Sequence, residues 1–160
     1  MNRKQKHSLL KIVLSALAVA VFGFILLNAT FLFDFLYQSL LNLVVTQFVR
    51  LNPDLDWSWY PPLKHLSFVV VIGLISWEIF STKLKLIYKA IYMTVPTAVV
   101  LVSVGMFLYR WPIVAYSLGA LLVVGTLFWF YRTKQPWIYY YTVILVGVAL
   151  GVFTLMGGEI

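Results

Sequence analysis

Five apolar runs, each close to the length of a membrane-spanning helix, constrain this chain more than any other feature of its sequence. A helix needs about 20 mostly apolar residues to cross roughly 30 Å of hydrocarbon. The expected spans cover residues 9–30, 63–81, 88–108, 112–130 and 137–156. The sequence therefore predicts a single all-α domain, a polytopic helical bundle in the membrane.

Composition supports membrane residence and excludes several function classes. Hydrophobic residues make up 62% of the chain and charged residues 11%, against about 45–50% and 25% in soluble domains. The chain has no cysteine, which excludes disulfides, thiolate metal sites and thiol nucleophiles. Its net charge of +7 forms no basic stripe on a solvated face, so the expected partner is the lipid bilayer and not nucleic acid.

Residues 31–51 contain neither glycine nor proline and form an amphipathic pattern. Polar residues recur every four positions on one side: Asp34, Gln38, Asn42, Thr46 and Arg50. Apolar residues occupy the other side: Phe33, Leu36, Tyr37, Leu40, Leu41, Leu43, Val44, Phe48 and Leu51. This pattern favours a helix lying in the membrane interface on the outer face. A helix that enters the bundle, or a sixth span, is the alternative.

The sequence predicts an external loop at residues 52–62. Pro53, Pro61 and Pro62 oppose helix formation there. Trp57, Trp59 and Tyr60 carry amphipathic rings that settle at headgroup depth. We expect this loop to lie close to the membrane and to serve as a docking surface.

The distribution of lysine and arginine predicts the orientation. With the N-terminus in the cytoplasm, five spans place nine of the 12 basic residues inside and only Arg50, Lys64 and Arg110 outside. Such an excess is what the positive-inside rule describes. The sequence therefore predicts a multi-pass protein of the cell membrane with its C-terminus outside.

No pattern in the sequence indicates catalysis, a metal or a cofactor. There is no nucleophile elbow and no phosphate-binding glycine loop. The predicted topology places His7 and His65 on opposite faces of the membrane, where they cannot share a metal or haem. His65 is expected to be solvated beside a helix start. We therefore do not expect an enzyme.

Polar residues at membrane depth are the remaining candidates for function, because they are costly there and often mark a pathway. Asp34, Gln38 and Asn42 would line a cleft if residues 31–51 entered the bundle, and would face water or headgroups otherwise. Glu78 lies near the inner end of the second span. It is expected either to pair with Lys83 or Lys85, or to act as a substrate-binding carboxylate.

Gly147 and Gly151 form a G-x-x-x-G motif in the last span, a pattern that lets helices approach closely. Either packing within the chain or contact with another subunit would use this face. The scarcity of polar groups in the spans favours a non-catalytic accessory or scaffold subunit, bound to other membrane subunits or to itself. The alternative is a small-solute transporter or lipid-handling protein that uses Asp34, Gln38, Asn42 and Glu78.

Overall fold

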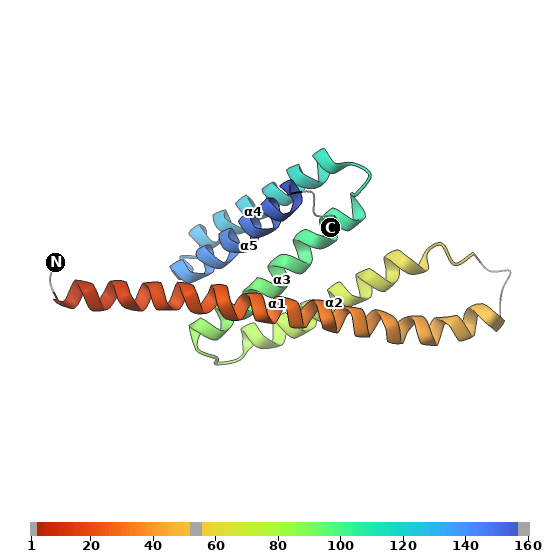
Figure 1. Ribbon diagram of the computed structural model, residues 1–160, viewed down its shortest axis with the longest axis horizontal. Coiled ribbons are helices and arrows are strands. Elements are labelled where there is room, and N and C mark those ends of the chain that lie inside the picture. The colour runs from red at the N-terminus through yellow and green to blue at the C-terminus, as the bar shows by residue number, and fades with distance from the viewer. Residues whose placement is uncertain (1–2, 52–55, 157–160) are drawn as a thin grey trace.

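The computed structural model describes residues 3–51 and 56–156. This part of the chain contains five helices and no strand. In chain order they are α1 (Arg3–Leu51), α2 (Tyr60–Ser81), α3 (Leu86–Phe107), α4 (Pro112–Arg132) and α5 (Trp137–Leu155) (Figure 1). All five are long and apolar enough to cross a membrane. The prediction of an all-α chain with five helices of spanning length is confirmed.

Helix α1 joins two elements that the sequence analysis separates. The span expected at 9–30 and the interfacial helix expected at 31–51 form one helix of 49 residues, about 73 Å long at 1.5 Å per residue. Polar residues at the junction do not interrupt the helix, because the Asn28 amide and the Thr30 hydroxyl each donate to a backbone carbonyl four residues earlier, at 2.8 Å. With no glycine or proline in residues 24–51, the chain continues along the same axis past residue 30 (Figure 1).

Helix α2 begins earlier than the predicted start at residue 63. Pro61 and Pro62 lie in its first turn, where backbone N–H groups have no partner within the helix and a missing one costs nothing. Tyr60 therefore belongs to α2, and the predicted loop is shorter than 52–62. Pro53, in the remainder of that loop, lies outside the described residues.

The helices run back and forth between two ends of the molecule (Figure 1). The basic end contains the start of α1 and the turns that join α2 to α3 and α4 to α5. Lys11 on α1 lies there, together with Lys83, Lys85, Lys89, Arg132 and Lys134 in and beside the two turns. The opposite end contains the end of α1, the start of α2 and the turn between α3 and α4, with Arg50, Lys64 and Arg110.

Helix α3 is central and packs against each of the other four helices. One buried cluster near the basic end joins α1, α3, α4 and α5 through Val19, Ala90, Phe130 and Val143. A second cluster joins α2 and α3 through Phe68, Ile72, Val95 and Val99. Between the two clusters, α1 crosses α3 at Gly23, where an added Cβ would lie 2.6 Å from Cγ2 of Thr94. An added methyl group at this crossing would therefore force the Thr94 side chain or the two helices to shift.

Candidate functional site

Asn42 ties α1 to α2 at the opposite end of the molecule. Its Oδ1 accepts hydrogen bonds from the Tyr60 hydroxyl at 3.1 Å and from Lys64 Nζ at 3.2 Å. Lys64 Nζ also lies 5.7 Å from the centre of the Tyr60 ring, within the range of a cation–π contact. The polar side of residues 31–51 thus contacts α2 at this point, and Asn42 holds two helices together.

Asp34 and Gln38 bond to each other along α1. Gln38 Nε2 lies 2.8 Å from both carboxylate oxygens of Asp34, and the pair is partly buried. Beside this pair, the Tyr37 hydroxyl of α1 donates to Ser67 Oγ of α2 at 2.9 Å. The Asp34 carboxylate is therefore already held by an amide donor.

Glu78 lies far from the other predicted polar residues. It is exposed on α2, 14 residues beyond Lys64, which corresponds to about 21 Å along a helix. Among the residues that the structure describes, no hydrogen bond or ion pair reaches its carboxylate, including any from Lys83 or Lys85. One small solute could not contact Glu78 and Asn42 together.

The aromatic residues at the start of α2 contact one another. The rings of Trp57 and Trp59 are 5.7 Å apart, and those of Trp59 and Tyr60 are 6.3 Å apart at right angles. Asp56 closes the turn beside them by accepting from the backbone N–H and the hydroxyl of Ser58, both at 2.9 Å. The backbone bond first, and then the hydroxyl bond, lower the pKa of Asp56. The predicted docking residues form one ordered aromatic group.

The two glycines of the predicted packing motif have different surroundings. A Cβ on Gly147 would lie 3.4 Å from Val123 on α4, so α4 and α5 are in close contact there. A Cβ on Gly151 would meet no atom within 4 Å. A contact between Gly151 and another subunit stays a prediction.

His65 and Ser103 form a buried pair that the sequence analysis missed. His65 is 8% exposed, in contrast to the solvated position expected for it. Ser103 Oγ donates to the Val99 carbonyl at 2.6 Å, so His65 Nε2 donates to Ser103 Oγ at 3.0 Å. No sequence signal links two residues 38 positions apart, because their meeting depends on how α2 and α3 pair.

The geometry of this pair suits a structural link between helices and not a catalytic relay. His65 Nδ1 is buried and has no hydrogen-bond partner, so no carboxylate among the described residues orients the ring as a serine–histidine–aspartate relay requires. The Ser103 hydroxyl donates to its own helix rather than to the imidazole. The ring of Phe107 packs edge-on against His65, 5.6 Å away. The pair links α2 to α3.

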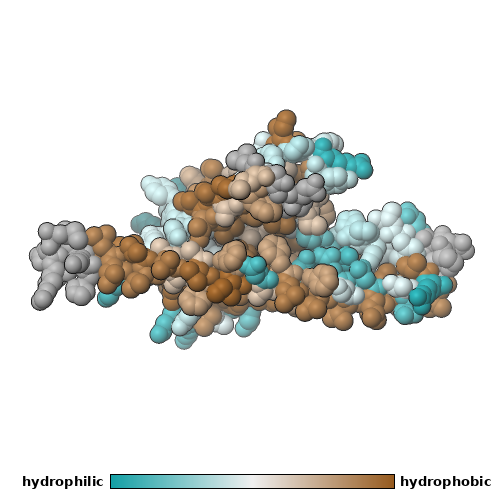
Figure 2. All heavy atoms as spheres, in the orientation of Figure 1, coloured by the Kyte–Doolittle hydropathy of each residue, from teal (hydrophilic) through white to brown (hydrophobic). Residues whose placement is uncertain are grey.

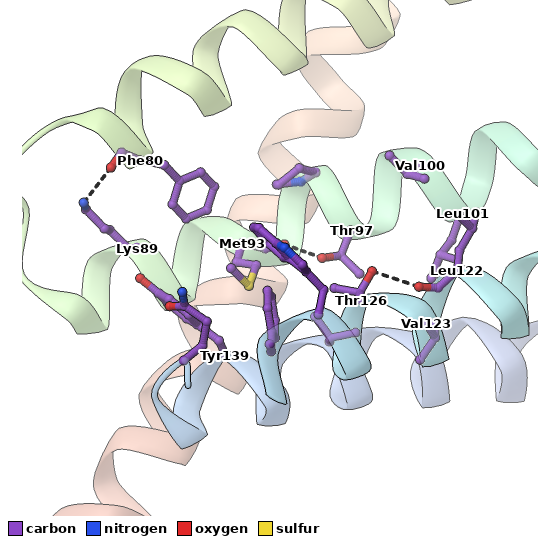
Figure 3. A pocket seen from close by; sticks show the side chains of 15 residues that line it. Phe80, Lys89, Met93, Thr97, Val100, Leu101, Leu122, Val123, Thr126 and Tyr139 are labelled. Carbon is purple, nitrogen blue, oxygen red and sulfur yellow. Dashed lines mark hydrogen bonds between the residues drawn. The ribbon is translucent and has the colours of Figure 1, made fainter. Parts of the chain in front are cut away.

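Two grooves lie between helices. The first, of about 660 Å³, is formed mainly by α3 and α4 and is partly open; Figure 3 shows the side chains that line it. The second, of about 580 Å³, lies between α1 and α5 over α3. Lys89 and Gln135 line the first groove, whereas no charged residue lines the second.

No family model, curated protein sequence or solved structure matches this chain.

Proposed function

We propose that this protein is a non-catalytic accessory or scaffold subunit of a complex in the cell membrane. In this proposal it crosses the membrane several times with its N-terminus in the cytoplasm and its C-terminus outside. The end of α1 and the start of α2, with Trp57, Trp59 and Tyr60, provide the docking surface. The amphipathic residues 31–51 then belong to a helical hairpin that extends from the bundle, and not to a helix lying flat in the interface.

The length of apolar surface on α1 carries this proposal. Exposed leucines occur from Leu9, which is 50% exposed, to Leu51, which is 75% exposed, a distance of about 63 Å along the helix. Even at a tilt of about 40°, the upper end of the usual range, this length projects about 48 Å onto the membrane normal. The hydrocarbon layer is only about 30 Å thick. Lipid tails alone cannot cover all of this surface, and apolar surface left outside the hydrocarbon favours contact with another protein.

The uncovered surface on the outer part of α1 points away from α2. Leu36, Leu40 and Leu43 are 52%, 66% and 67% exposed, and their spacing places them on one helix face. Figure 2 shows hydrophobic residues along most of α1, with hydrophilic ones gathered where α1 meets α2. Because this face is uncharged and one helix wide, it fits an apolar helix of another integral membrane protein.

Site-specific photo-crosslinking in native membranes tests the proposal. A crosslinker at Leu40 should capture one integral membrane protein, and Leu36→Ala with Leu43→Ala should abolish that product. Trp57→Ala with Trp59→Ala should weaken recovery of the same protein. A crosslinker at Leu121 on α4, also 67% exposed, is the matched control and should not capture it. Products from Leu40 that contain only lipid, or only a second copy of this chain, would overturn the proposal.

A transport function that uses the polar residues of α1 is the second candidate. The partly buried Asp34–Gln38 pair favours it, since a carboxylate at membrane depth can serve a pathway. Transport or lipid binding should then change in Asp34→Asn, with Glu78→Gln measured beside it. If both variants fold normally and behave as the unaltered protein in every assay, this candidate is discarded.

A further inference from the structure

The groove between α3 and α4 is polar at one end and apolar along the rest of its length. Lys89, Gln135 and Tyr139 line it near the basic end of the molecule. Figure 3 shows Lys89 and Tyr139 at one end of the groove and Leu101 and Leu122 at the other. A ligand that fills this groove must therefore have a polar head and an apolar tail.

Two threonines inside the groove do not interrupt its apolar stretch. The Thr97 hydroxyl donates to the Met93 carbonyl, and the Thr126 hydroxyl to the Leu122 carbonyl, each at 2.8 Å (Figure 3). Their donors are satisfied within their own helices, which leaves mainly methyl groups to contact a ligand. The surrounding walls are provided by valine, leucine, methionine and proline side chains and by the aromatic rings of Phe80, Trp129 and Phe130.

The length of the apolar stretch matches one leaflet of a bilayer. Lys89 and Leu101 are 12 residues apart on α3, which is about 18 Å along a helix. One leaflet contributes half of a hydrocarbon core that is about 30 Å thick, or roughly 15 Å. An acyl chain that runs from a headgroup at Lys89 toward Leu101 would therefore end near the middle of the bilayer.

The charge at the mouth of the groove favours an anionic headgroup. Lys89 Nζ donates one hydrogen bond to the Phe80 carbonyl at 2.7 Å, and an ammonium group has two further donors to offer. The surrounding turns add Lys85, Arg132 and Lys134. Glu78 is the one acidic residue among the described residues at this end, and it does not line the groove. Basic pockets between membrane helices bind anionic lipid headgroups in this way.

We propose that the groove between α3 and α4 binds one anionic phospholipid, with its phosphate at Lys89 and an acyl chain along Met93, Thr97, Val123 and Thr126. Gln135 and Tyr139 supply further polar groups beside the headgroup. An acyl chain lying in this partly open groove would gain dispersion contacts with its apolar lining. This site is independent of the docking surface proposed for α1 and α2.

Native mass spectrometry of the full chain tests the site, with phosphatidylglycerol and phosphatidylcholine supplied together at equal amounts. The unaltered protein should retain phosphatidylglycerol in preference. Lys89→Gln keeps a donor for the Phe80 carbonyl but removes the charge, so this preference should fall about tenfold, as expected for losing one charge-assisted hydrogen bond. Lys83→Gln removes an exposed charge at the same end that does not line the groove, and should change the preference less than twofold.

A pair of groove-filling variants separates this site from general lipid contact. Thr126→Phe places a ring in the proposed site and should abolish the retained phosphatidylglycerol. Ala149→Phe fills the second groove and should leave it bound. An equal loss of preference in Lys89→Gln and Lys83→Gln, or full retention in Thr126→Phe, would overturn the proposal. These outcomes do not depend on whether α1 captures a partner.

Discussion

His65 Nε2 lies 3.0 Å from Ser103 Oγ, across the contact between α2 and α3, and both side chains are buried. Ser103 also donates to the Val99 carbonyl, so the histidine must donate to the serine. Two further polar contacts join the same helices, Ser76 Oγ with the Tyr92 hydroxyl at 3.2 Å and Lys89 Nζ with the Phe80 carbonyl at 2.7 Å. The bond between His65 and Ser103 is the buried one of these three, and it helps to fix the position of α2 along α3, which apolar side chains such as Phe68 and Val95 alone specify weakly.

Removing the serine hydroxyl should destabilise the fold. Ser103→Ala leaves both ring nitrogens of His65 buried without a partner, and we expect a loss of about 1 kcal/mol, within the range for hydrogen bonds between membrane helices. Unfolding by SDS titration measures it. Ser39→Ala is the matched control, because that hydroxyl is exposed and donates to its own helix at Phe35. It should change stability little.

A double variant distinguishes this cause from a packing defect. In Ser103→Ala with His65→Phe, both polar partners are replaced by apolar groups, which can be nearly neutral. Stability should recover toward that of the unaltered protein. If Ser103→Ala is no less stable than Ser39→Ala, the hydrogen bond does not stabilise the contact between α2 and α3.

The close crossing of α1 and α3 gives a second prediction. Gly23→Ala adds a methyl group 2.6 Å from Thr94 Cγ2, and overpacking of this kind typically costs about 1–3 kcal/mol. We expect a lower unfolding midpoint in detergent. Gly73→Ala is the control, because an added Cβ there meets no atom within 4 Å. It should be neutral or slightly stabilising, since alanine favours helix more than glycine does.

A second substitution, at Thr94, tests whether its Cγ2 atom causes the loss of stability in Gly23→Ala. Thr94→Ser removes Cγ2 but keeps the hydroxyl that donates to the Ile91 carbonyl. Combined with Gly23→Ala, it should recover most of the lost stability. A double variant as unstable as Gly23→Ala alone would show that the backbone, and not this side chain, sets the distance between α1 and α3.

The five spanning helices could be predicted because the signal lies in local composition. Long apolar runs bounded by lysines and prolines determine where helices of spanning length form, whatever their neighbours. The continuity of α1 was not predicted. The polar residues Asn28 and Thr30 suggest the end of a membrane span. Both side chains donate hydrogen bonds to backbone carbonyls of the same helix, so they are compatible with the interior of a continuous helix.

The polar contacts between helices could not be predicted, because each depends on tertiary pairing. Asn42 was a candidate from its spacing on α1, but its role depends on Tyr60 and Lys64, which α2 brings to it. His65 follows two prolines in sequence and was expected to be solvated. It is buried only because Ser103 and Phe107 on α3 lie against that turn of α2.

The predicted orientation can be tested with single cysteines, since the chain has none. Leu84→Cys and Tyr109→Cys place an exposed thiol in a turn at each end without removing a charge. A membrane-impermeant maleimide should label Tyr109→Cys in intact cells, and Leu84→Cys only after permeabilisation, because the positive-inside rule predicts that the basic end lies in the cytoplasm. Labelling of Leu84→Cys in intact cells would reverse the orientation and move the proposed lipid to the other leaflet.

The turn between α4 and α5 gives the last prediction. Gln135 N–H donates to the Phe130 carbonyl at 3.0 Å, and Lys134 N–H to the Tyr131 carbonyl at 3.3 Å. These two bonds form a Schellman motif at the end of α4. Lys134 is at the position that glycine usually occupies, with φ of 50°. A side chain with a Cβ is strained in this left-handed conformation, by about 1–2 kcal/mol.

Replacing this lysine by glycine should therefore stabilise the protein. We expect Lys134→Gly to raise the free energy of unfolding by about 1 kcal/mol, since relief of the strain exceeds the extra freedom of glycine in the unfolded chain. Lys134→Ala removes the same charge but keeps a Cβ, so it should give no gain. Lys134→Asn should fall between them, because asparagine tolerates the left-handed region. Equal stability of the glycine and alanine variants in SDS titration would mean that any change comes from the lost charge and not from the backbone.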